Sequence, residues 1–84
     1  MEKAFDYLSV EQIGRNKYKI AGRVLLPIYL GSRLTTLDGR NEIDIISIIY
    51  YGKEITELEP MFTCYLMVSC SLELKGNTGI FYKM

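Results

Sequence analysis

The chain has 84 residues, 49% of them hydrophobic, and no formal net charge. This length leaves room for one small core, so we expect residues 1–84 to form a single domain. The neutral balance disfavours a strongly basic nucleic-acid binder. The charge is uneven, however: residues 1–40 carry seven basic and four acidic side chains (+3), and residues 41–84 carry three and six (−3).

Cysteine and histidine usage narrows the chemistry. The chain has two cysteines, Cys64 and Cys70, and no histidine. On an extended strand the cysteines would lie roughly 20 Å apart, too far for a disulfide, which needs Cα atoms within about 7 Å. We interpret them as small buried hydrophobes in a reducing compartment. The N-terminus lacks the pattern of a signal peptide, and the apolar runs are too short to span a bilayer, so a cytoplasmic location is expected.

The first half of the chain is predicted to form three strands. Phe5–Ile13 is rich in strand-favouring residues, although its apolar positions do not alternate cleanly and a helix is the alternative. Lys17–Leu26 alternates apolar with basic or small residues, which predicts one buried and one solvated face. Gly22 inside this strand predicts a bend or a close neighbour. Pro27 ends or bends the strand because it cannot donate to the ladder. A short third strand is predicted over Arg33–Leu37.

The second half is predicted to add three more strands. Asp38-Gly39 is a turn signal and precedes an apolar strand over Glu42–Tyr51. Lys53–Pro60 is expected to be a loop or a short helical turn. Met61–Cys70 alternates as a fifth strand, and Ile80–Tyr82 closes the chain as a sixth. Six short strands with glycine-rich turns indicate an all-β barrel or sandwich.

Several segments, taken in order, resemble the second-domain β-barrel of translational GTPases such as elongation factor Tu. The matching segments are Val10–Ile13, Gly22–Val24, Ile28–Ser32, Ile45–Ile48, Glu59–Met61 and Asn77–Tyr82. The resemblance implies a small closed six-stranded antiparallel, Greek-key-like barrel. In that family the barrel contacts the aminoacyl end of tRNA or the small ribosomal subunit, beside a GTPase domain. This chain contains no G-x-x-x-x-G-K-[ST] phosphate loop of its own.

Catalysis has little support in the residues. Without histidine, Ser–His and Cys–His pairs and histidine metal sites are excluded. Two cysteines alone cannot hold zinc, and the carboxylates are scattered over predicted turns. We therefore expect a non-enzymatic protein with no cofactor and no metal.

The predicted fourth strand is apolar on both faces, which a barrel with one core does not require. Exposed apolar patches mark partner surfaces, so we expect a protein partner, or a second copy of the chain, to bind here. The candidate interface residues are Ile46, Ile48, Tyr50, Tyr65 and Met67. The alternative is that Lys53–Pro60 or the first strand covers this face.

A second candidate surface is the basic outer row of the second strand. Its residues are Arg15, Lys17, Lys19 and Arg23, which could bind phosphates of RNA or the ribosome. The alternative is an ordinary solvated barrel face. The sequence thus predicts a non-catalytic interaction module with no role at a membrane. A protein partner is the first expectation, RNA the second and a small ligand at a barrel end the third.

Overall fold

The computed structural model describes residues 1–84 and contains strands and turns but no helix. The strands are β1 (Lys3–Gly14), β2 (Lys17–Val24), β3 (Ile28–Tyr29), β4 (Arg33–Thr35), β5 (Glu42–Tyr50), β6 (Lys53–Ile55), β7 (Glu57–Leu58), β8 (Thr63–Cys70) and β9 (Gly79–Lys83). All six predicted strands are present. The interpretation of Lys53–Pro60 as a loop or helical turn is wrong, because β6 and β7 form there. The structure contains no helix that could span a membrane.

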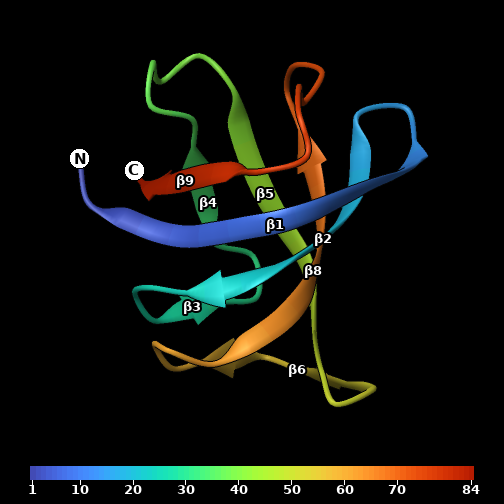
Figure 1. Ribbon diagram of the computed structural model, residues 1–84, viewed down its shortest axis with the longest axis vertical. Coiled ribbons are helices and arrows are strands. Elements are labelled where there is room, and N and C mark those ends of the chain that lie inside the picture. The colour runs from blue at the N-terminus through green and yellow to red at the C-terminus, as the bar shows by residue number, and fades with distance from the viewer.

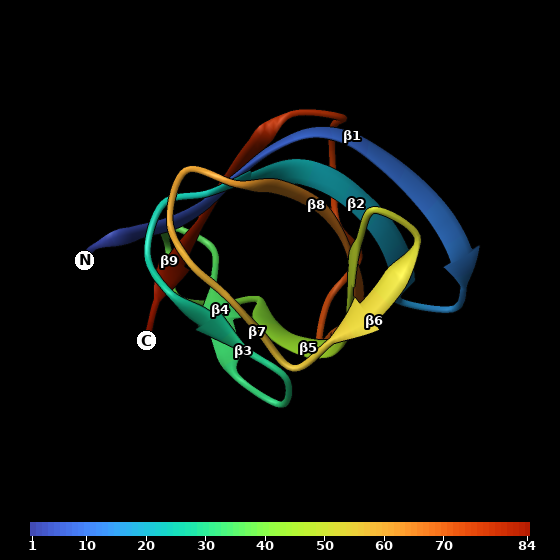
Figure 2. The same ribbon diagram turned by 90° about the horizontal axis from the view of Figure 1, so that it is seen from below.

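Six of the strands close into an antiparallel barrel (Figures 1 and 2). Going round the ring, the order is β4-β9-β1-β2-β8-β5, and a pairing between β4 and β5 closes it. Strands β4, β5 and β8 are neighbours in the ring and follow one another along it. The next ring strand in the chain, β9, returns to pair with β4. This is the order of a Greek key. The predicted closed six-stranded barrel is therefore confirmed, with β6 as an extra strand on β5 and a β3–β7 ribbon beside it.

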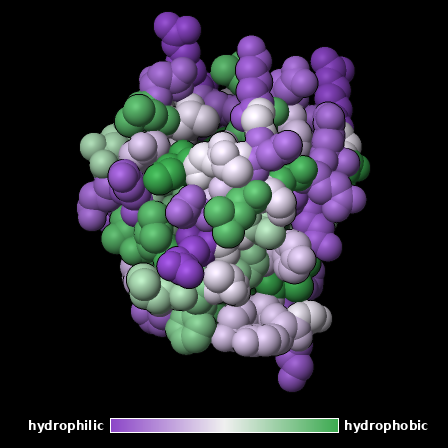
Figure 3. Space-filling view, in the orientation of Figure 1, coloured by the Kyte–Doolittle hydropathy of each residue, from purple (hydrophilic) through white to green (hydrophobic).

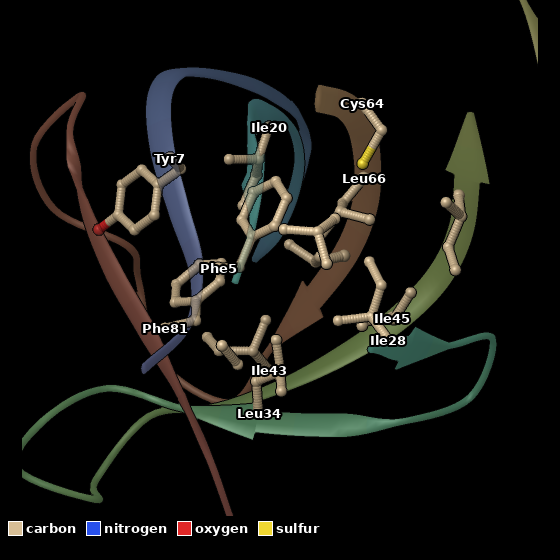
Figure 4. Packing of buried hydrophobic residues seen from close by; sticks show 14 of the residues in the cluster. Phe5, Tyr7, Ile20, Ile28, Leu34, Ile43, Ile45, Cys64, Leu66 and Phe81 are labelled. Atoms are coloured by element: carbon tan, nitrogen blue, oxygen red, sulfur yellow. The ribbon is translucent and has the colours of Figure 1, made fainter. Parts of the chain in front are cut away.

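The core fills the inside of this ring (Figure 4). Phe5, Ile20, Leu66 and Phe81 are fully buried and point inward from four different strands. Strand β2 shows the predicted alternation: its apolar positions are buried, and its basic residues face outward. Each large aliphatic or aromatic side chain buried this way stabilises the fold by about 1.5–3 kcal/mol.

A β-bulge in β5 corrects the predicted faces of that strand. Ile45 pairs with Val68 of β8, but the next pair is Ser47 with Met67, so Ile46 is an extra residue without a partner. Because side chains alternate along a strand, one extra residue reverses the faces of everything that follows it. Ile48 therefore points into the core and is 0% exposed.

For this reason the prediction that Ile48 lies on the outer face is wrong, whereas Tyr50 is turned toward the core but also lines a surface groove. Tyr50 is half-buried and packs against the core at the end of the barrel. Ile49 lies outside in their place, opposite Tyr65. The apolar residues on both predicted faces of this strand are thus partly explained by a change of face within it.

Candidate functional site

An apolar outer face remains on β5 and β8 after this correction. It consists of Ile46, Ile49, Tyr65 and Met67, and we call these four residues the outer face. Ile46 is 50% exposed and Tyr65 48%, while Ile49 and Met67 are half-buried. Three predicted interface residues, Ile46, Tyr65 and Met67, therefore lie on one surface.

A groove of about 370 Å³ lies beside the outer face and crosses four strands. Its lining includes Leu8 of β1, Ala21 of β2, Tyr65 of β8 and Ile49 of β5. The row is continuous because Ala21 pairs with Tyr65, which in turn pairs with Ile49. The methyl side chain of Ala21 is much smaller than its neighbours, so it forms a low point between larger apolar side chains. A groove of this kind can accept an apolar side chain of a partner.

Tyr51 lines the groove from the hairpin turn between β5 and β6. Tyr51 and Gly52 both have positive φ, 50° and 74°, the backbone of a type I′ turn. Such turns favour Asn-Gly, and a bulky side chain in the left-handed region is strained. Yet the Tyr51 side chain is 88% exposed. Burial therefore does not explain a tyrosine at this position.

The ring of Tyr51 belongs to a row of edge-to-face aromatic contacts. Its centroid lies 4.6 Å from that of Tyr50, which lies 5.6 Å from that of Phe62. Edge-to-face pairs at these distances are favourable. The row places the exposed ring at the end of the groove.

Acidic residues of β1 lie opposite two members of the basic row of β2. Lys19 pairs across the sheet with Glu11, and Arg23 pairs with Asp6. The Nζ atom of Lys19 also lies 4.6 Å from the ring centroid of Tyr65, a cation–π contact. Lys17 and Arg15 lie further along, where β2 begins and in the turn before it. The predicted row exists as a surface, but opposite charges face two of its members.

The two cysteines are buried free thiols, as predicted for small core hydrophobes. Burial raises the pKa of Cys64 to about 11, and burial together with the Asp44 carboxylate raises the pKa of Cys70 to about 11. Thiols with these pKa values stay protonated at neutral pH and are poor nucleophiles. No three acidic or cysteine side chains are grouped so that they could hold a metal ion.

The side of the molecule that carries β1 is different in character (Figure 3). Hydrophobic side chains on this side are separated by hydrophilic ones. Ile13 of β1 is nevertheless exposed. This side therefore presents single apolar residues, whereas the outer face and the groove bring several together.

Sequence reasoning missed Leu8, Ile49 and Tyr51 as parts of the site. Leu8 and Ile49 occupy their places because of bulges, which simple alternation cannot reveal. Tyr51 could have been found, since Tyr51-Gly52 is a two-residue loop in which the first position favours asparagine. A tyrosine in that place is itself a signal.

Comparisons with known proteins identify no relative of this chain. No protein-family model, no characterised protein and no solved structure matches this chain. The closed barrel is shown by the structure, but nothing links it to the second domain of translational GTPases.

Proposed function

We propose that this chain is a non-catalytic interaction module that binds a protein partner through the outer face and the adjoining groove. The observation that carries the proposal is Tyr51, an exposed aromatic side chain on strained backbone at the end of an apolar groove. Left-handed backbone at a non-glycine residue costs about 1–3 kcal/mol. The exposed ring of Tyr51 recovers little of that by burial, whereas a partner that covered it would.

The chemistry of the surface favours a protein over other partners. Tyrosine combines a large apolar ring with a hydroxyl and is enriched where partners bind. Tyr51 and Tyr65 both line the groove, with Leu8 and Ile49 beside them. These residues supply an aromatic anchor and an apolar cleft, the elements of a binding hot spot.

The test uses a substitution that separates binding from folding. Tyr51→Asn removes the ring but places the favoured residue in the type I′ turn, so the melting temperature should stay the same or rise. Binding partners captured from an extract of the source organism should be lost with Tyr51→Asn and with Tyr65→Asp. They should be retained with Leu37→Asn, which changes an exposed apolar residue in the β4–β5 turn region. Equal capture of partners by the unmodified protein and these three variants would contradict the proposal.

RNA or ribosome binding is the second candidate function. It is favoured by Lys19 stacked over the exposed ring of Tyr65, with Lys17 and Arg23 on the same face, since exposed aromatic rings beside cations bind single-stranded nucleic acids. The resemblance of the sequence to the translation-factor barrel would fit this role, beside a separate GTPase. Asp6 and Glu11, opposite Arg23 and Lys19, weigh against it.

Filter binding with tRNA and ribosomal RNA distinguishes the two candidates. RNA binding predicts an affinity that falls steeply with salt and is weakened by Lys19→Gln. Protein binding predicts that capture of the partner survives treatment with RNase.

A further inference from the structure

The second half of β1 has a sheet edge that nothing in the chain covers. Strand β9 pairs with β1 only from Lys3 to Tyr7, whereas β2 pairs with β1 as far as Gly14. No backbone hydrogen bond joins the other edge of Leu8–Gly14 to any part of the chain. Between the bulges at Leu8 and Ile13, this segment therefore presents N–H and C=O groups in the spacing of a β-ladder. The partner that complements such a row is another extended polypeptide strand.

The free edge is open to approach. In Figure 2 the second half of β1 lies at the outer margin of the molecule, and β2 lies on its inner side. Two apolar side chains flank the segment: Leu8 is 65% exposed and Ile13 46%. Glu11 is the only charged side chain between them. This segment has none of the lysines, prolines or covering loops that protect many natural edges, although a β-bulge lies near each end of it.

Pairing with a second copy of the chain is possible in few registers. An antiparallel pair of identical strands has its two-fold axis normal to the sheet, so one residue faces its own copy at the centre. A centre at Glu11 would place two carboxylates opposite each other, which is unfavourable. A centre at Gln12 would place the bulged residue Ile13 inside the ladder, between Gln12 and Gly14. A centre at Ser9 would pair only Leu8 to Val10 before β9 is reached.

A centre at Val10 avoids facing like charges and keeps both bulged residues out of the interior of the ladder, because Leu8 lies at its end. It pairs Leu8 with Gln12 of the second copy and Ser9 with Glu11 of the second copy, and it uses only residues of the free edge. Ser9 and Glu11 both face outward, because they pair with Ala21 and Lys19 of the outward row of β2. No like charges then face each other across the new pair of strands.

We propose that two copies of this chain associate weakly by antiparallel pairing of β1 with β1, centred on Val10. The pairing would join two barrels into one continuous sheet. It would also place two outer faces on a common surface, so the module would present its partner-binding site twice. This inference does not rest on the proposed function, because it concerns the edge of β1 and not the outer face.

The test uses opposite charges at Ser9. Ser9→Asp places a carboxylate opposite Glu11 of the second copy, twice per dimer, and should weaken the dimer about tenfold. Ser9→Lys places an ammonium group there and should strengthen it by a similar factor. Within one chain the order is reversed, since position 9 lies diagonally between Lys19 and Arg23 of β2. Ser9→Asp should therefore not lower the melting temperature of the monomer.

Sedimentation equilibrium up to about 1 mM protein measures the dimer, which is expected to be weak because the paired segment is short. Thr56→Asp and Thr56→Lys make the same charge changes at an exposed residue outside the edge and should leave the dissociation constant unchanged. Opposite shifts at Ser9 support the proposal. A protein that is monomeric at every concentration would overturn it. So would a dimer that responds equally to both Ser9 variants, or to Tyr65→Asp instead.

Discussion

Gly22 lies where β2 passes close to β1. A Cβ atom at this position would lie 2.2 Å from the carbonyl oxygen of Asp6, 2.7 Å from the Cα atom of Tyr7 and 2.8 Å from the Cε2 atom of Phe5. Two of these three atoms belong to the backbone, which cannot turn aside as a side chain can. The substitution Gly22→Ala therefore tests the packing of the two strands directly.

The cost of Gly22→Ala follows from these contacts. To reach ordinary van der Waals separation the strands must move apart by roughly 1 Å. Overpacking in a core costs about 1–3 kcal/mol, and each ladder hydrogen bond that is lost adds about 0.5–1.5 kcal/mol. We expect a loss of about 3–5 kcal/mol. A domain of this size has roughly 4–13 kcal/mol in total, so the variant should be largely or partly unfolded.

Two other glycines serve as controls, measured by urea and thermal unfolding. Gly14→Ala would meet only Lys17 side-chain atoms, at 3.6 Å or more, and should be neutral or stabilising by about 0.4–1 kcal/mol. Gly31→Ala has open space but a φ of +83°, and should cost about 1–2 kcal/mol. The expected order is Gly22→Ala far below Gly31→Ala, with Gly14→Ala above both. If Gly22→Ala were as stable as Gly14→Ala, the close crossing of β1 and β2 would be refuted.

Two further predictions test the bulge and the buried thiols. Ile48→Ala should lower the unfolding free energy by about 2–5 kcal/mol because the side chain is fully buried. Ile46→Ala, at the bulged residue, should change it by about 0.5 kcal/mol or less. Equal effects of the two substitutions would place the bulge elsewhere. Burial raises the pKa values of Cys64 and Cys70 from an ordinary 9.0 to about 11, so the folded state favours the neutral thiols. Their contribution is complete below pH 9 and is lost as the pH rises toward 11, by up to about 1.4 kcal/mol per pH unit for each thiol. Urea titrations across this range should show a shallower fall for the Cys64→Ala, Cys70→Ala double variant, and identical slopes would contradict the burial of the thiols.

The strand pattern was accessible from sequence because most strands have a regular period. Lys17–Leu26 alternates apolar and basic residues, and β2 follows that alternation to Val24. Turn residues also marked their places, as at Asp38-Gly39, where Gly39 has a φ of 74°. Short strands were missed where the pattern is too brief to show a period, as in Lys53–Pro60, where β6 and β7 each need a neighbouring strand to form.

The candidate site was only partly accessible for a related reason. Tyr65 and Met67 lie on β8, whose alternation is unbroken, and they were placed correctly on the outer side. The residues after the bulge in β5 were placed on the wrong sides of the sheet. A period of two assumes no extra residue, so one bulged residue reverses the predicted face of every later residue in the strand.

By itself, the sequence determined that the chain is an all-β domain with one core, since its residues alternate and its turns contain glycine at the right places. The tertiary structure alone decided which strands are neighbours, where β1 and β5 take an extra residue, and which backbone edge stays free. These features depend on contacts between segments far apart in the chain, such as the pairing of β4 with β9 in the ring and the pairing of β9 with β1, which stops at Tyr7. A local sequence pattern cannot predict where a distant partner strand stops pairing. The outer face, the groove and the free edge could therefore be identified only in the folded chain.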